Sequence, residues 1–136
     1  MSWFFPQPAE RSSLEKIVAA SPDWSLRLFK NNVAANEEHV LADFTEADFP
    51  GYAAVVPPTQ DGDVETDGDG KARQWFELAL FTLDLPDTET YSIYGAYIVG
   101  DDDLILCYER FSDAPKILST TNPVLVLKPF ITLNTA

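Results

Sequence analysis

The sequence predicts an all-β protein, a jelly-roll-like β-sandwich of about eight short strands with one short N-terminal helix. Three observations carry this prediction. Several short stretches alternate between apolar and polar residues, as half-buried strands do. Turn-forming glycines, prolines and aspartates separate these stretches. Only one segment repeats its apolar residues at helical spacing, and the alternating βα pattern of a nucleotide-binding fold is absent. A jelly roll is one arrangement that accommodates such strands.

The expected strands follow one another along the chain. They are 24–30, 52–56, 73–83, 91–100, 104–111 and one or two within 122–133, and the stretch 31–40 is a polar loop or a further short strand. The stretch 73–83 is apolar on both faces, so it is covered on both sides or offers one side as an interface. The clearest hairpin joins 91–100 to 104–111 through a turn of glycine and aspartates.

The single expected helix covers residues 11–20. Ser12 and Glu15 have the spacing of a capping box, in which side chains satisfy the first backbone N–H groups. The apolar residues that follow share one face. Pro22 ends the helix because proline lacks an N–H group.

Residues 1–8 are expected to form an extended arm, and residues 9–136 a single β-sandwich domain. The prolines of the arm disfavour helix in the residues before them. Trp3, Phe4 and Phe5 are three consecutive aromatics, which is unusual for a solvated tail. They either fold back on the chain's own core or dock on another subunit. We assign them to partner binding.

Composition and charge exclude several classes of function. Apolar residues make up 46% of the chain, which excludes a disordered protein. No uninterrupted apolar stretch approaches the about 18 residues of a membrane span, and the N-terminal residues lack the pattern of a signal peptide. The formal charge of −13, without clustered Lys or Arg, argues against nucleic acid and anionic membranes as direct partners. Such a charge steers a protein toward basic surfaces.

The acidic tract "DGDVETDGDG" (61–70) invites comparison with a calcium-binding loop. When the loop starts at Asp61, its first ligand positions are acidic, but the required glycine is replaced by Thr66 and the final glutamate by Ala72. A start at the next candidate aspartate fails as well. We therefore expect no metal site but a charged, solvated loop between two strands. A looser calcium site stays open as an alternative.

Candidates for catalysis are few, and we expect no enzyme and no cofactor. His39 is the only histidine and is expected at the surface. Cys107 is the only cysteine, so no intrachain disulfide can form, and its mid-strand position predicts an inert, buried thiol. Glu77 and Glu109 could form a glycosidase pair if they faced each other across strands. No nucleophile elbow, phosphate-binding loop or zinc spacing is present.

Tyrosines gather on the predicted hairpin. They are Tyr91, Tyr94, Tyr97 and Tyr108. Aromatic cross-strand pairs stabilise sheets, which is one interpretation. The other is a surface that stacks against sugars or binds a protein.

Four short runs suggest a family. "LFKNN", "LADFTEADFPGYA", "YSIYGAYIV" and "YERF", spread over residues 26–111, resemble small virion structural proteins of tailed bacteriophages. Within that group the chain is most similar to capsid cement, or decoration, proteins built on a jelly roll. The resemblance implies an all-β domain that binds the outside of a capsid shell. It carries no ligand motif from which residue roles could be transferred.

The expected function is therefore that of a non-enzymatic virion protein, made in the host bacterial cytoplasm and located on the capsid surface. It would bind the major capsid protein, stabilise contacts between capsid subunits and associate with itself, as a homodimer. The alternative is a carbohydrate- or receptor-binding jelly-roll module of a phage tail or fibre, which would use the tyrosines of the hairpin.

Overall fold

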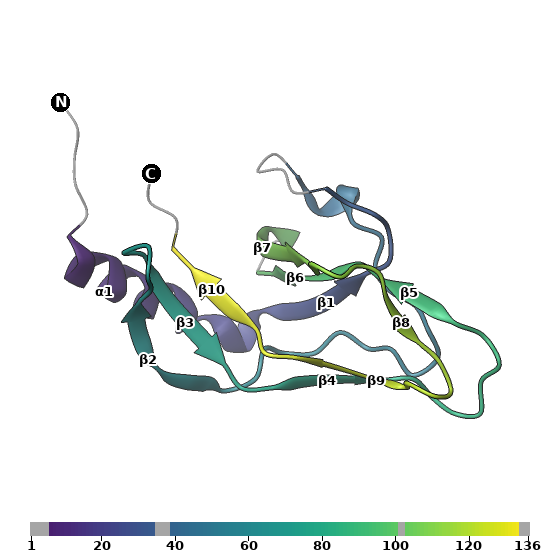
Figure 1. Cartoon of the computed structure of the whole chain (residues 1–136). Helices are drawn as coiled ribbons and strands as arrows, with labels where there is room; N and C mark the ends of the chain where they lie inside the picture. The colour runs from purple at the N-terminus through teal and green to yellow at the C-terminus, as the bar shows by residue number, and fades with distance from the viewer. Residues whose placement is uncertain (1–5, 35–38, 101–102, 134–136) are drawn as a thin grey trace. The chain divides into compact units, whose positions relative to one another are not determined.

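The computed structural model of the protein describes residues 6–34, 39–100 and 103–133 (Figure 1). These residues form mostly β-strands in several antiparallel sheets, with one α-helix. The predicted all-β fold class with one short N-terminal helix is therefore confirmed, and the sheets are consistent with a β-sandwich. The described strands number ten, slightly more than the sequence suggests. The expected partner-binding residues Trp3, Phe4 and Phe5 lie outside the described residues.

The chain forms two compact units. Unit 1 comprises Met1–Pro22, Pro57–Ala79 and Leu127–Ala136, and unit 2 comprises Asp23–Val56 and Leu80–Val126. Each unit has its own buried core. The single domain expected for residues 9–136 spans both.

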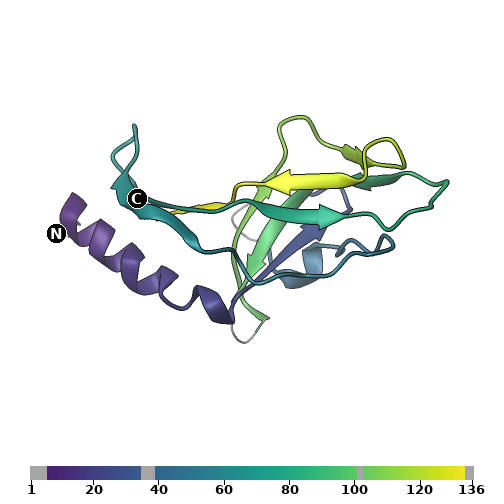
Figure 2. The same cartoon turned by 90° about the horizontal axis from the view of Figure 1, so that it is seen from below.

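Unit 1 consists of a three-stranded sheet and a helix. Its elements are α1 (Gln7–Val18), β2 (Gln60–Thr66), β3 (Ala72–Phe76) and β10 (Phe130–Thr132), with the strands in the order β10-β3-β2. Figure 2 shows α1 in purple beside the teal hairpin of β2 and β3. Leu14 and Val18 of α1 and Ala72 and Phe76 of β3 are buried, so the inward face of the sheet packs on the helix.

The helix begins earlier than the sequence pattern suggests. Pro6 is its N-cap and Pro8 lies in its first turn, where no intrahelical N–H bond is lost. Gln7 and Pro8, expected in the extended arm, are therefore helical. Ser12 lies inside the helix rather than at its cap. The helix ends at Val18, where the Ala19 N–H group donates to the Glu15 carbonyl.

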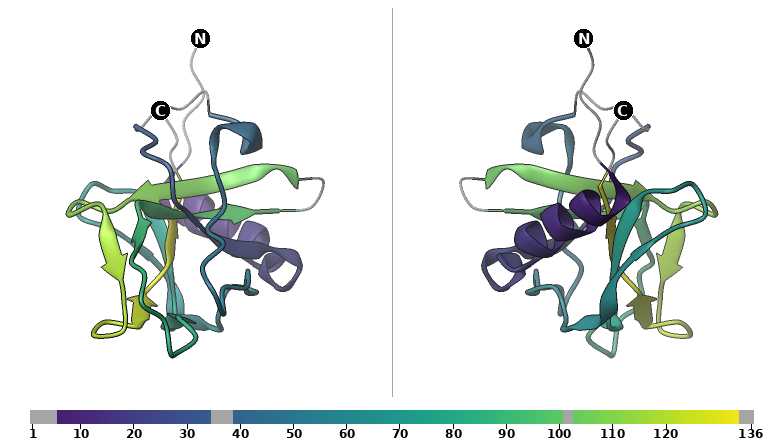
Figure 3. Two further views of the ribbon diagram at one scale, coloured as in Figure 1. Left: turned by 90° about the vertical axis from the view of Figure 1, so that its right-hand side faces the viewer. Right: turned by 90° about the vertical axis from the view of Figure 1, so that its left-hand side faces the viewer.

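Unit 2 contains one three-stranded sheet and two strand pairs. The sheet has the order β1 (Ser25–Phe29), β6 (Gly95–Val99) and β7 (Ile105–Arg110); β4 (Ala79–Thr82) pairs with β9 (Val124–Leu127), and β5 (Tyr91–Ile93) with β8 (Lys116–Leu118). The predicted hairpin is confirmed as β6 and β7, whose green ribbons run side by side in Figure 3. The expected strand 73–83 is interrupted at Glu77 and Leu78. The expected strand 52–56 is reduced to one bridge between Val55 and Leu26.

An aromatic cluster forms the core beneath this sheet. Phe29 is fully buried and meets Phe44 edge-on at 5.1 Å, while Tyr97 stacks on Phe44 at 5.0 Å. Gly95 makes this packing feasible, because a Cβ atom there would overlap the Glu109 carbonyl and the Phe29 ring. The residue type at this position is therefore dictated by space.

Candidate interaction surfaces

The β4–β9 pair presents apolar side chains to solvent. Burial alternates along both strands, so Phe81 and Leu125 point inward while their neighbours point outward. The Leu83 N–H group donates to the Pro123 carbonyl at 2.7 Å and holds the ends of the strands together. The outward residues, which we call the apolar face, are Leu80, Thr82, Val124 and Val126. Leu80 is 59% exposed, Val126 49% and Val124 40%, although side chains of this kind gain most from burial.

Acidic residues follow the apolar face at one end. We call Asp84, Asp87 and Glu89 the acidic rim, because they lie on the loop that leaves β4. Partial burial and then the hydrogen bond to Asp87 raise the pKa of Tyr91 to about 12. The Tyr91 hydroxyl donates to Asp87 at 2.9 Å. The Thr120 hydroxyl donates to the Asp87 carbonyl, which ties this loop to the one that enters β9.

The two units differ in charge. By sequence, unit 2 holds 14 acidic and 4 basic residues, and unit 1 holds 8 and 5, so unit 2 carries −10 of the formal −13. The stretch 74–109 contains no Lys or Arg at all. The rim therefore belongs to a strongly negative stretch of the chain.

The outward face of the unit 1 sheet is built differently. Trp75 lies in register with Phe130 on one side and Asp61 on the other, and the two rings are 4.8 Å apart. The Arg73 guanidinium lies 5.0 Å from the Trp75 ring and bonds Glu65 at 2.9 Å. We call these residues, with Lys128, the Trp75 cluster.

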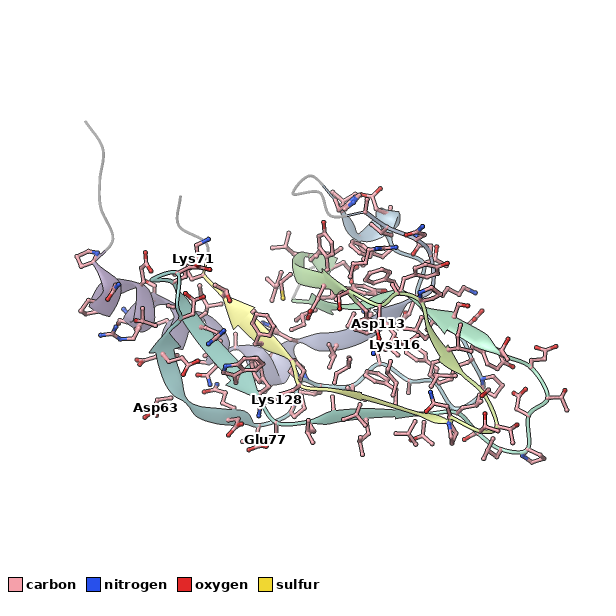
Figure 4. All side chains as sticks on the ribbon, in the orientation of Figure 1. Asp63, Lys71, Glu77, Asp113, Lys116 and Lys128 are labelled. Atoms are coloured by element: carbon pink, nitrogen blue, oxygen red, sulfur yellow. The ribbon has the colours of Figure 1, made fainter. Side chains whose placement is uncertain are left out.

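Further contacts close this cluster. The indole N–H of Trp75 donates to Glu65 at 3.2 Å, and Lys128 pairs with Asp61. Figure 4 shows Lys128 just before β10, whereas Asp63 points away from β2. The charges of this face are thus largely paired within the chain.

The acidic tract is not the loop that the sequence suggests. Most of it is strand β2, and Asp67–Gly70 form the turn into β3. Asp67 Oδ1 accepts the N–H groups of Asp69 and Lys71, both at 2.9 Å, and the Lys71 bond lowers the pKa of Asp67. Gly70 supplies the positive φ of 79° that the turn needs.

The carboxylates of the tract point to separate partners. Asp61 binds Lys128, Glu65 binds Arg73, and Asp67 binds backbone N–H groups. Within residues 6–34, 39–100 and 103–133, no group of three or more His, Cys, Asp or Glu side chains gathers in a way that could hold a metal ion.

The residues considered for catalysis have different surroundings. Glu77 belongs to unit 1 and Glu109 to unit 2. His39 is held by the Ala34 carbonyl at 2.7 Å and by Asp43 at 3.3 Å. Burial, with a smaller effect of Glu109, raises the pKa of Cys107 to about 12, so the thiol stays protonated.

The four tyrosines of the hairpin region do not share an open surface. Tyr97 is 2% exposed and belongs to the aromatic core. Tyr108 packs edge-on against Phe44 at 5.0 Å, and the Arg110 guanidinium lies 6.0 Å from the Tyr94 ring. Tyr91 lines a pocket of unit 2.

The pocket in unit 2 has a volume of about 280 Å³. Its apolar wall comes from Ala47, Phe49 and Ile93, and its polar wall from Lys30, Asp48, Thr90, Tyr91 and Ser92. Lys30 pairs with Asp48 at 2.9 Å, which places a cation and an anion at the same opening.

The sequence pattern did not indicate that Tyr52 links two segments of unit 2 through its hydroxyl group. Its hydroxyl donates to Glu46 at 2.6 Å and accepts the Leu28 N–H group at 3.2 Å, while burial raises its pKa. The residue lies in an irregular segment, so no periodicity signals its role. The apolar face was indicated only by the two-sided apolar character of 73–83.

Comparison with known proteins adds no relative: no family model, no curated protein and no solved structure matches the chain. The α-helix of the described chain is too short to cross a membrane.

Proposed function

We propose that the protein is a non-enzymatic structural component of a tailed-phage virion. It binds the outside of the capsid and stabilises contacts between major capsid subunits. The observation that carries this proposal is the apolar face of β4 and β9, because contiguous exposed apolar side chains mark interaction surfaces.

Two further points support the proposal. The sequence resembles capsid decoration proteins over residues 26–111. A symmetric shell repeats each contact many times, so a modest surface on each copy adds up to a substantial stabilisation of the particle. The expected homodimer, with contacts by Trp3, Phe4 and Phe5, stays a prediction of the same proposal.

Phage heads assembled with and without the protein test this function. We expect heads that carry the protein to melt at higher temperature, and the Leu80→Glu variant to bind them at least about tenfold more weakly. Leu104→Glu is the matched control, because Leu104 is 62% exposed and lies outside the apolar face. Heads of equal melting temperature, with the protein shown to be bound, would contradict a stabilising role.

A sugar-binding function is the second candidate, favoured by the unit 2 pocket. Tyr91 offers a half-buried aromatic ring beside the polar groups of Lys30 and Asp48, and the buried ring of Phe49 lies behind it at a centroid distance of 6.2 Å. Apolar walls with a few convergent polar groups are typical of small-ligand pockets. A glycan array with wild type, Tyr91→Ala and the control Tyr94→Ala tests it, and sugar binding lost only in Tyr91→Ala would favour this function.

A further inference from the structure

We propose that the apolar face binds a protein surface whose apolar patch is bordered by Lys and Arg side chains. The inference rests on the proposed function, since it names the chemistry of the partner at the surface through which that function acts. Two features of unit 2 lead to it: the side chains of the apolar face and the charge beside them.

The first feature requires an apolar partner. Leu80, Val124 and Val126 leave 40–59% of their surfaces exposed on two paired strands. Thr82 is the only polar member of the face, so the face offers little to hydrogen-bonding ligands such as sugars. Covering the three aliphatic side chains is favourable by the hydrophobic effect, and a well-fitting apolar surface supplies that cover.

The second feature sets the charge of the partner. Asp84 continues the outward alternation after Leu80 and Thr82, and it is exposed. Asp87 and Glu89 follow in the same loop. Between positions 74 and 109 the sequence offers no cation to neutralise them. A partner that meets this end of the sheet therefore gains by placing Lys or Arg opposite the rim.

The cations of unit 2 are already engaged. Lys30 pairs with Asp48 at 2.9 Å, Lys116 with Asp113 at 3.1 Å, and Arg27 lies 4.0 Å from Glu46. Figure 4 shows Lys116 beside Asp113. Arg110 donates to Asn32 at 2.8 Å. None of these four contacts involves the rim, so a basic partner would supply it with a counter-charge.

A second copy of the chain is a poor occupant of this face. Two copies docked through their apolar faces would bring two units of formal charge −10 together, with like charges at both rims. Such juxtaposition costs free energy and slows association. The apolar face thus favours a basic partner over a homodimer.

Three synthetic amphipathic peptides of equal length probe this chemistry with the full chain. One carries Leu and Lys on opposite faces, one Leu and Glu, and one Ser and Lys. By fluorescence anisotropy, we expect only the Leu/Lys peptide to bind, and to bind several-fold more weakly at about 0.5 M than at about 0.05 M NaCl. Equal binding of the Leu/Glu peptide would overturn the charge argument. Equal binding of the Ser/Lys peptide would overturn the apolar argument.

Variants locate the binding. Leu80→Glu should weaken binding of the Leu/Lys peptide about tenfold, although it adds negative charge, whereas the control Leu104→Glu should leave it unchanged. The double variant Asp84→Asn, Glu89→Gln should reduce the salt dependence. Its control, Asp23→Asn with Glu109→Gln, makes the same charge change elsewhere in unit 2. Equal effects in variant and control would overturn the assignment.

Two readouts separate this inference from the proposed function. Wild type that sediments as a dimer, and as a monomer after Leu80→Glu, would identify a second copy as the occupant and overturn the proposal. Heads that bind the protein equally well before and after Leu80→Glu would leave capsid binding intact while refuting the apolar face as its site. Failure to bind heads together with selective Leu/Lys binding would refute the virion function and keep the partner chemistry.

Discussion

The outward faces of two small sheets differ in how their large side chains are shielded from solvent. In unit 1, Trp75 is covered by Phe130, Arg73 and Lys128, and carboxylates pair with the cations. In unit 2, the outward face of β4 and β9 is aliphatic, and no side chain of its own strands covers it.

This difference indicates that one face contributes to the stability of the fold and the other to binding. The Trp75 cluster completes its face with residues of the same sheet, so that face contributes to folding. The apolar face gains less from folding, because its three aliphatic residues keep 40–59% of their surface in water. A face left incomplete in this way is available to a partner.

The largest expected effect tests the inward and outward sides of β4. Phe81→Ala should lower the free energy of unfolding by about 3–5 kcal/mol, because Phe81 is buried and stacks on Tyr52 at 6.0 Å. Leu80→Ala, one residue away, should change it by less than about 1 kcal/mol. Urea unfolding followed by circular dichroism measures both.

A large loss in Leu80→Ala would break the comparison. It would mean that other residues of the chain cover the apolar face, so that its side chains are not accessible to a partner.

An intermediate effect is expected in unit 1. Trp75→Ala removes the contact with Phe130, the cation–π contact with Arg73 and the donor to Glu65, and should cost about 1–2 kcal/mol of unfolding free energy. Trp75→Phe keeps a ring and loses only the N–H donor, so it should cost less. Urea denaturation at neutral pH is the measurement, and an unchanged midpoint for Trp75→Ala would show that the Trp75 cluster contributes nothing to folding.

The smallest effect concerns alkaline pH, where the absorbance of tyrosine reports on unit 2 alone, because all five tyrosines belong to it. Tyr91 has its pKa raised to about 12, while an unfolded chain ionises tyrosine near about 10. The stabilisation is therefore full below about pH 10 and is lost as the pH rises through about 12, since the unfolded state releases its proton first.

Phenolate absorbance and urea midpoints along this pH range check the prediction. Tyr91→Phe should flatten the decline of stability, because the group with the shifted pKa is gone. A decline of undiminished slope in Tyr91→Phe would assign the alkaline effect to other groups, Tyr52 first, whose pKa burial raises further.

Sequence patterns predicted the hairpin and the helix, because both depend mainly on interactions between residues that are close in sequence. The hairpin of β6 and β7 was foreseen because alternating side chains flank a glycine and aspartate turn. The helix was foreseen over residues 11–20, but it begins at Gln7. The prediction assigned Pro6 and Pro8 to an extended arm, whereas they fit the N-cap and the first turn of the helix.

The all-β class, the negative charge and the absence of familiar catalytic motifs follow from the sequence alone, because composition and short-range periodicity encode these properties. Tertiary structure decided that most of the acidic tract forms a strand. Asp61 is paired there with Lys128, which is distant in sequence, and Glu65 with Arg73, which lies opposite it in the β2–β3 hairpin. It also decided which side chains of 73–83 are exposed: the strand is interrupted at Glu77 and Leu78, so the even-numbered residues are buried in β3 and the odd-numbered ones in β4. Alternation marks two faces of a strand, and only packing against the rest of the chain determines which of them is buried.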